Sequence, residues 1–312
     1  MRQQLYSNRR STVIGLIVIC LVPAPACTPA ADEAQSTSRP AETEKIRYGK
    51  ARKLADLADE RISESSGVAA GRLADGVFWT HNDSGDAPRI YAFNLKGEAL
   101  ATYTVTGAQA VDWEDMASFT LDEKPYLLLA DIGDNAARRK FVTLYVVPEP
   151  KLSDDARGAA GRVAVAMKID FTYADGPQDC EAVAVDPTER AIILVSKRGR
   201  RKAYKLPLPD ETPAKPLVAE KIADLDIPWT TAMDISPDGR RAVVLTYADA
   251  YEYVREKGQT WAQAFARPPV KLPMPGRAQG EGICYGRDGK TLYLTSEKLP
   301  APLLEVPVVE GD

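Results

Sequence analysis

Short apolar segments alternate with tight polar turns along most of this chain, and no long stretch has helical periodicity. Five segments share one layout, which is a short strand, a polar turn and then a strongly apolar strand. They read SGVAAGRLADGVFWTHND, EDMASFTLDEKPYLLLADIGD, EAVAVDPTERAIILVSKR, MDISPDGRRAVVLTYAD and EGICYGRDGKTLYLTSEK. Runs of β-branched and aromatic residues that are bounded by turn residues predict an all-β fold.

These segments recur at intervals that suggest a structural repeat. They begin at Ser66, Glu114, Glu181, Met233 and Glu281, so the spacings are 48, 67, 52 and 48 residues. Further apolar segments such as RIYAFNL, VTLYVVP and KAYKLPL follow each pair. Four antiparallel strands per repeat of roughly 40–50 residues are typical of a β-propeller. We therefore expect a single all-β propeller of five blades, with six as the alternative if the longest interval holds an additional half-blade.

The last repeat shows only three strands, and the segment before the first repeat can supply the fourth. Residues 50–62 read KARKLADLADERI and carry apolar positions next to the first repeat. Pairing strands from both ends of the chain removes a free sheet edge. The sequence therefore predicts a ring that is closed by an N-terminal strand.

The first residues have the layout of a bacterial export signal. Basic residues precede an apolar run over residues 11–22, which is too short to span a membrane and is followed by APAC. Cleavage after Ala26 fits both an A-x-A signal-peptidase site and a lipobox with Cys27 as the lipidated residue. We expect a signal peptide over 1–26, the lipobox cysteine and a disordered tether over 27–45, and the propeller over 46–312.

This layout predicts a cell-envelope protein, periplasmic or extracytoplasmic, that touches the membrane only through its N-terminal lipid. Without residues 1–26 the chain has 37 basic and 44 acidic residues, which gives no electrostatic case for binding nucleic acid.

The basic run KRGRRK over 197–202 is expected to be a solvated hairpin. Cys180 and Cys284 lie in repeats that are not neighbours, so free thiols are favoured over a disulfide. We expect a monomer.

The propeller topology brings polar segments together at one edge. In an up-and-down blade, the start of the innermost strand and the end of the second strand lie at the same edge. VDWED, QDCEA and QGEGI therefore share a face with THNDSGD, DIGDN and TSEK. Asp86, Asp115, Asp134, Asp179 and Glu297 are expected on this face. The residues expected to bind a ligand at the channel mouth are His81, Asn82, Asp83, Asp112, Trp113, Glu114, Asp131, Asn135, Glu181 and Glu281.

Several of these motifs carry a family resemblance. ESSG, WTHNDSGD, DWEDMA and DIGDN resemble a family of exported bacterial propeller proteins of unassigned function. The recurring E-G-I or E-A-V at strand starts is similar to a wider group that includes SdiA-regulated propellers and phytase-like "esterase-like" propellers. The resemblance covers residues 62–150 densely and the rest only through the repeats. It implies a propeller and an exported location, and it implies no established reaction.

The single histidine invites a catalytic interpretation. His81 lies three residues before Ser84, but a serine nucleophile needs a base that is itself held by an acid, and G-x-S-x-G is absent from the sequence. A loop in which the side chains of Asn82, Asp83 and Ser84 form hydrogen bonds with their own backbone explains the same sequence. Zinc is disfavoured because it prefers several histidine or cysteine ligands.

Calcium is the metal that the composition permits, because it takes six to eight oxygen ligands. The expected ligands are Asp83, Glu114, Asp131 and Glu181. The alternative is that the acids bond backbone amides between blades, which would also explain why they recur at one strand position. Trp113 is expected to pack between blades rather than to stack on a ligand.

Two functions from different classes fit these observations. The first is a binding or scaffold propeller that engages a small ligand or another envelope protein through its acidic mouth. The alternative is a calcium-dependent hydrolase of an ester, lactone or phosphoester, in which the ion acts as the electrophile. The sequence leaves open whether the protein is an enzyme.

Overall fold

The computed structural model describes residues 46–153 and 157–309, which belong to one compact unit of the chain. The predicted signal peptide over 1–26, the lipidated Cys27 and the tether over 27–45 lie outside the described residues. Within the described part, no helix is long and apolar enough to cross a membrane.

The strands form four hydrogen-bonded sheets, in two of which neighbouring strands are all antiparallel. One of these two has the order β15-β16-β17-β18 and the other β19-β20-β21-β1. Their strands are β15 (Thr230–Ile235), β16 (Arg241–Thr246), β17 (Asp249–Val254), β18 (Val270–Pro273), β19 (Gly280–Tyr285), β20 (Leu292–Ser296), β21 (Pro302–Val306) and β1 (Arg52–Asp56). The short helix α1 (Trp261–Phe265) lies between β17 and β18 in the chain.

The other two sheets each contain a parallel pairing of outer strands. One has the order β2-β3-β4-β5-β9, in which β9 pairs in parallel with β5. The other has the order β6-β7-β8-β10-β14-β13-β12-β11, and its two antiparallel halves meet where β10 pairs in parallel with β14. The strands are β2 (Ser65–Ala70), β3 (Val77–Asn82), β4 (Arg89–Asn94), β5 (Ala99–Thr106), β6 (Trp113–Leu121), β7 (Lys124–Asp131), β8 (Val142–Pro148), β9 (Ala159–Ala164), β10 (Met167–Tyr173), β11 (Cys180–Asp186), β12 (Ala191–Ser196), β13 (Arg201–Pro207) and β14 (Leu217–Leu225).

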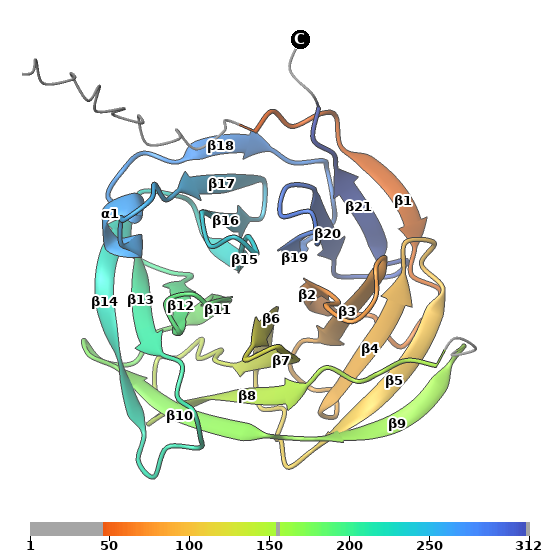
Figure 1. Ribbon diagram of the computed structural model, residues 1–312, viewed down its shortest axis with the longest axis horizontal. Helices are drawn as coiled ribbons and strands as arrows, with labels where there is room; N and C mark the ends of the chain where they lie inside the picture. Colours follow the sequence, from red (N-terminus) through yellow and green to blue (C-terminus); the bar gives the residue numbers. More distant parts are fainter. Residues whose placement is uncertain (1–45, 154–156, 310–312) are drawn as a thin grey trace, which may run out of the picture. The chain divides into compact units, whose positions relative to one another are not determined.

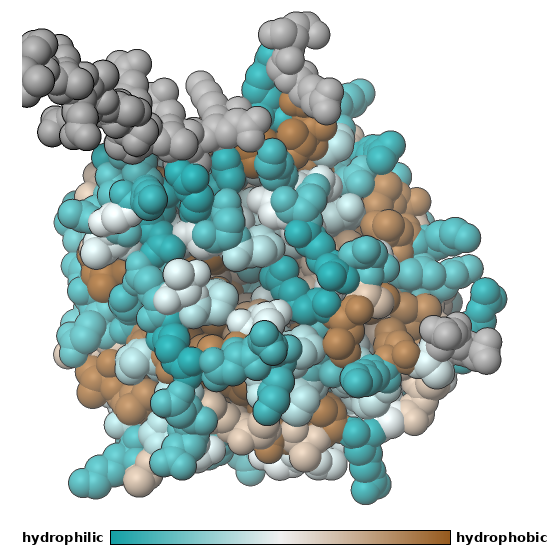
Figure 2. Space-filling view, viewed as in Figure 1, coloured by the Kyte–Doolittle hydropathy of each residue, from teal (hydrophilic) through white to brown (hydrophobic). Residues whose placement is uncertain are grey.

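The sheets are arranged around a common centre (Figure 1). Strands β2, β6, β11, β15 and β19 are innermost, and each contacts the next in this order until β19 returns to β2. This arrangement is a β-propeller, so the predicted all-β propeller fold is confirmed. Hydrophilic side chains cover much of the face seen along the central axis, and hydrophobic patches lie between them (Figure 2).

A strand from the N-terminal segment pairs with the last strand of the chain. Strand β1 is antiparallel to β21, with Arg52 opposite Glu305 and Asp56 opposite Pro302. An isolated bridge between Tyr48 and Val308 extends this pairing. The fourth strand of the last sheet therefore comes from residues 50–62, as the sequence indicated.

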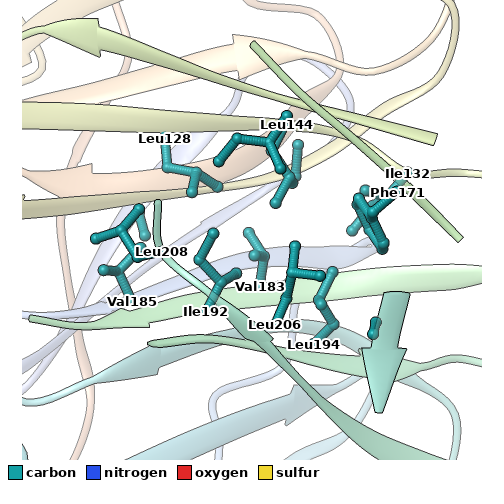
Figure 3. Packing of buried hydrophobic residues seen from close by; sticks show 14 of the residues in the cluster. Leu128, Ile132, Leu144, Phe171, Val183, Val185, Ile192, Leu194, Leu206 and Leu208 are labelled. Atoms are coloured by element: carbon teal, nitrogen blue, oxygen red, sulfur yellow. The ribbon is translucent and has the colours of Figure 1, made fainter. Parts of the chain in front are cut away.

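The core lies between neighbouring sheets and not on one side of a single sheet. Successive side chains of a strand point to opposite faces, so Leu128 joins the apolar cluster between β7 and β12, while Leu127 and Leu129 join the cluster toward β4. Figure 3 shows Leu128 and Leu144 facing Val183 and Ile192 across the first of these clusters. Burial on both faces explains why YLLLA is continuously apolar. Truncating one such leucine to alanine costs about 2–5 kcal/mol.

The innermost strands share an irregularity near their first residue. The register shifts between Trp113 and Asp115, and equivalent shifts occur in the four other innermost strands. The extra residues are Glu114, Glu181, Thr231 and Glu281, and in β2 the shift spans Ser66 and Gly67. A bulge re-aims the side chain that it carries. In the fourth repeat, the residue equivalent to Glu114 is therefore Thr231, two residues before Met233, where the sequence pattern placed the start of this repeat.

Candidate metal centre

One edge of the ring collects the starts of the innermost strands and the ends of the second strands, and we call this edge the mouth. Trp113 lies opposite Asp131, Cys180 opposite Ser196 and Gly280 opposite Ser296. The loops that precede the first members and follow the second members of these pairs therefore meet at the mouth.

Three carboxylates converge at the mouth from two neighbouring sheets. One oxygen from each of Asp83, Asp112 and Glu114 lies within 4.8 Å of the other two. Asp83 follows β3, Asp112 precedes β6, and Glu114 is the bulge residue of β6. We call these three side chains the carboxylate cluster.

Glu114 is the most buried member of the carboxylate cluster, with 6% of its surface exposed. Among the described residues, its side chain makes no hydrogen bond and no ion pair. Burial raises the pKa of Glu114 well above its ordinary value, and the nearby carboxylates of Glu181, Asp83 and Asp112 raise it further. Such a group needs a proton or a cation to be stable in this position.

Asp112 has a related environment. Burial raises the pKa of Asp112 to about 6, and the charge of Asp83 adds to this effect while Arg139 opposes it. The backbone amide of Gly133 donates to the Asp112 carbonyl oxygen at 3.2 Å. The loop that follows β7 therefore lies directly against the carboxylate cluster.

Gly133 has to lack a side chain because two carboxylates occupy the space beside it. A Cβ atom on this residue would lie 2.1 Å from Oε1 of Glu114 and 2.4 Å from Oδ2 of Asp112. Sequence reasoning missed this role. The signal was present in DIGDN, where a glycine stands between two aspartates directly after a buried strand.

Asp131 lies next to the carboxylate cluster but is engaged by other partners. Its carboxylate accepts hydrogen bonds from the backbone amides of Val111 at 3.3 Å and Asp112 at 3.2 Å. It also forms an ion pair with Arg139 at 2.7 Å. Asp131 therefore fixes the segment that carries Asp112.

Two further residues of the β7–β8 loop shape the same part of the mouth. Asp134 accepts from the backbone amides of Arg138 at 2.9 Å and Arg139 at 2.7 Å. Asn135 is exposed, and its side-chain oxygen accepts a hydrogen bond from Arg198. Both residues stabilise the loop and stand outside the carboxylate cluster.

Glu181 and Glu281 occupy the bulge position of Glu114 in two other innermost strands. Glu181 forms an ion pair with Lys197, whose ammonium group lies 5.2 Å from the centre of the Tyr247 ring. Burial raises the pKa of Glu181 to about 8, against the opposing effect of Lys197. Burial also raises the pKa of Glu281 to about 7, although the Gln279 amide donates to its Oε1 at 2.9 Å.

The basic run over 197–202 forms the hairpin connection between β12 and β13 that the sequence suggested, and residues 198–200 are exposed, but Lys197 is an exception. Lys197 is buried at the mouth beside Glu181, and Arg198 pairs with Asp179 at 2.7 Å. Arg198 also lies 5.9 Å from the ring centre of Trp229, which is 51% exposed. Glu181 and Asp179 therefore have cations in direct ion pairs, whereas the carboxylate cluster feels Arg139 and Lys197 only through longer-range charge interactions.

His81 lies inside the protein, not at the surface of the mouth. Its Nδ1 forms a hydrogen bond with the carbonyl oxygen of Asn82 at 2.9 Å, and its ring meets Trp113 edge to face at 5.3 Å. Burial lowers its pKa. Trp113 is itself buried in an apolar cluster and donates from Nε1 to the Gln109 carbonyl oxygen at 2.8 Å.

Asn82 serves the shape of the loop. Its Nδ2 donates to the Arg61 carbonyl oxygen at 2.7 Å and to Asp86 at 3.0 Å. Asp86 also pairs with Arg89 and accepts from the Tyr91 hydroxyl at 3.0 Å. Of the acidic residues in HNDSGD, Asp83 alone belongs to the carboxylate cluster.

Asp115, which the sequence also placed at the mouth, has a different environment. Its carboxylate accepts hydrogen bonds from the backbone amides of Met116 at 2.8 Å, Val183 at 2.9 Å and Met233 at 3.0 Å. Asp234 likewise accepts from the amides of Ile235 and Tyr285, both at 2.8 Å. These two aspartates bond backbone amides across the ring. This is the alternative to a calcium site that the sequence allowed, in which acids bond backbone amides between blades.

No family model and no curated protein matches this chain. Among solved structures, the chain is similar to the PQQ-bound form of aldose sugar dehydrogenase from Streptomyces coelicolor. The two share 11% sequence identity and a TM-score of 0.48, over 85% of this chain and 99% of the other. At that level the similarity carries no argument about the chemistry of this protein.

Proposed function

We propose that this protein binds a divalent cation through Asp83, Asp112 and Glu114, and uses the occupied mouth to hold a small ligand or a partner protein. The observation that carries this proposal is the convergence of three carboxylate oxygens within 4.8 Å, one of them from a buried Glu114 without a hydrogen-bond partner. Three like charges in a poorly hydrated position repel each other, and a divalent cation would remove that cost.

Calcium fits the donor set best. The cluster offers hard oxygen donors and no imidazole or thiolate, and calcium fills its remaining positions with backbone carbonyls or water. Asp131 and Glu181, the other ligands expected from the sequence, are held by Arg139 and Lys197. In this proposal they orient the site from outside, and Asp112 takes a ligand position instead.

A calcium titration of the full chain tests this function. At a calcium concentration 100 times the dissociation constant, the free energy of unfolding should rise by about 2.7 kcal/mol, because the ion binds only the folded state. Asp83→Asn, Asp112→Asn and Glu114→Gln should each reduce that rise. Glu211→Gln, at an exposed acid away from the mouth, is the matched control. Unchanged melting with calcium, magnesium and manganese, together with no metal in the purified protein, would disprove the proposal.

A second function, a calcium-dependent hydrolase of an ester or lactone, is favoured by one observation. The pKa of Glu281, about 7, matches what a general base needs near neutral pH. The charge of Asp83 contributes to that pKa, so Glu281 lies within electrostatic reach of the carboxylate cluster. A phosphoester fits less well, because the mouth is acidic unless a cation is bound. Glu281→Gln should abolish turnover on an ester and lactone panel and leave the calcium-induced melting shift in place.

We propose five blades for the propeller. Five innermost strands follow each other around the centre, and each begins with the same register shift and leads a set of antiparallel strands. The fifth strand of the first sheet, β9, is then an addition to that blade's outer edge. A sixth blade would need a further innermost strand within the 67-residue interval, whose described residues form β6 to β10, with β6 innermost.

We also propose that the protein is an exported, lipid-anchored monomer related to exported bacterial propellers of unassigned function. The N-terminal sequence and the motifs WTHNDSGD, DWEDMA and DIGDN support this proposal. The net negative charge argues against a nucleic-acid partner. Cys27→Ala should move the protein from the membrane fraction to the soluble fraction. A wild-type chain that is already soluble and begins with an unmodified Cys27 would support the A-x-A cleavage and refute the lipid.

A further inference from the structure

A cavity of about 140 Å³ lies between the loop that joins β7 to β8 and the loop that follows β10. Its lining includes the buried side chains of Val142, Phe171 and Tyr173. Phe141, which is 41% exposed, and the half-buried Gln178 also line it. None of these residues belongs to the carboxylate cluster.

The volume of the cavity and its aromatic lining favour a ligand with a single ring. An engineered cavity of about 150 Å³ in another protein admits a benzene molecule, so the present volume suits a monocyclic ligand. Phe171 and Tyr173 meet edge to face with their centres 5.3 Å apart, but Phe171 is fully buried and Tyr173 is 6% exposed, so Phe141 supplies the accessible aromatic surface of the lining. A planar ring can pack against the open surface of Phe141.

The charges around the cavity favour a negative group on that ring. Lys140 lines the cavity, is exposed, and has no ion pair among the described residues. Arg139 also lines it and is paired with Asp131. The opposing acid in the lining is Asp134, whose oxygens already accept the amides of Arg138 and Arg139.

We propose that this cavity binds a monocyclic aromatic acid, with its ring against Phe141 and its carboxylate at Lys140. The site stands on residues other than those of the proposed cation site, so either proposal can fail without the other. The binding energy that so small a ligand can supply places the dissociation constant on the order of 1 mM.

Isothermal titration calorimetry of the full chain with benzoate tests this site. Benzoate should bind saturably, and acetate, which lacks the ring, should not. Benzyl alcohol, which lacks the charge, should bind about two- to fivefold more weakly, because an exposed ion pair contributes little. Lys140→Ala should weaken benzoate by the same factor. Lys124→Ala, at an exposed lysine on β7, is the control that should change nothing.

Filling the cavity gives the decisive comparison. Thr172 and Gln178 are half-buried lining residues, and Thr172→Trp or Gln178→Trp should abolish benzoate binding. Two variants in different segments are used because one of them could fail to fold, which a melting curve would reveal. Absence of saturable benzoate binding, or binding that survives in a folded tryptophan variant, would overturn the proposal.

Discussion

Glu114 and Asp115 are neighbours in the sequence, yet the protein treats their carboxylates in opposite ways. Asp115 accepts hydrogen bonds from three backbone amides, and two of these belong to other innermost strands, β11 and β15. Glu114 is also buried, but its carboxylate has other carboxylates beside it and no hydrogen-bond donor among the described residues. The difference separates an acid that holds the ring together from an acid that is left available to a ligand.

The bulge at the start of β6 produces this difference. It inserts Glu114 as an extra residue between Trp113 and Asp115, so that Glu114 leaves the regular alternation of the strand. Other innermost strands place a hydroxyl at this position. Ser66 donates to the Glu114 carbonyl oxygen at 2.5 Å and Thr231 to the Gly280 carbonyl oxygen at 2.7 Å. The bulge position therefore either links neighbouring strands or presents a carboxylate to the mouth.

The largest effect should come from removing an acceptor at Asp115. Asp115→Asn keeps the shape but turns one oxygen into a donor, so at least one buried backbone amide faces an N–H group. Each buried donor left without an acceptor costs about 1–3 kcal/mol, and we expect a total loss of about 3–5 kcal/mol in the free energy of unfolding. Chemical denaturation measures this loss.

Asp112→Asn is the matched control for that measurement. The Asp112 side chain accepts no hydrogen bond among the described residues, so the change should alter the free energy of unfolding by less than about 1 kcal/mol. Equal losses in the two variants would show that the backbone bonds of Asp115 do not distinguish the two kinds of acid.

The next effect concerns pH and Glu281. Its pKa is about 7 in the folded protein and near 4.5 when unfolded. Between these values the folded state holds a proton that the unfolded state releases, so stability falls as pH rises from about 4.5 to 7. Glu281→Gln removes this titration. The fall should become smaller by about 1–3 kcal/mol, as measured by denaturation at pH 5 and pH 8.

The pKa of His81 is shifted in the opposite direction, so His81 should give the opposite dependence of stability on pH in the same experiment. Burial lowers its pKa, so the unfolded state takes up the proton first and stability falls as pH drops below the ordinary histidine value. His81→Ala should flatten the acidic side of the profile, whereas Glu281→Gln flattens the neutral side. A Glu281→Gln profile that matches the wild type would show that Glu281 titrates normally.

A smaller effect is expected at Glu114 without metal. Glu114→Gln removes a carboxylate that other carboxylates destabilise, so the metal-free protein should gain about 1 kcal/mol at pH 8. The same variant should lose most of the stabilisation by calcium. A variant that is less stable without metal and still responds to calcium would place Glu114 among the structural acids.

The sequence could predict the ring and the gathering of acids at one edge, because both follow from strand order and repeat spacing. It could not distinguish acids that are engaged in ion pairs or hydrogen bonds from acids that are free to bind a ligand. Asp131 is engaged by Arg139 and Glu181 by Lys197, and each of these pairs depends on how a loop folds back. The need for Gly133 also depends on two side chains that occupy the space of its missing Cβ.

The alignment of the repeats failed for a related reason. A bulge adds a residue to one strand without changing the apolar pattern. The sequence of the fourth repeat is therefore compatible with a start at Met233 as well as at Thr231. Thr231 carries no charge and gave no sign that it shares the position of Glu114. Its hydroxyl becomes recognisable only through its bond to the next innermost strand.

The smallest effect should be found at Asn135, which the sequence placed among the ligand-binding residues. Its side chain is exposed and accepts one hydrogen bond from the exposed Arg198, which also pairs with Asp179. Asn135→Ala should therefore change the free energy of unfolding by less than about 0.5 kcal/mol. The calcium-induced melting shift should stay the same, because Asn135 lies outside the carboxylate cluster. If Asn135→Ala reduces that shift as strongly as Glu114→Gln, then the cation site extends along the β7–β8 loop, and the boundary drawn between loop-shaping and ligand-binding residues is misplaced.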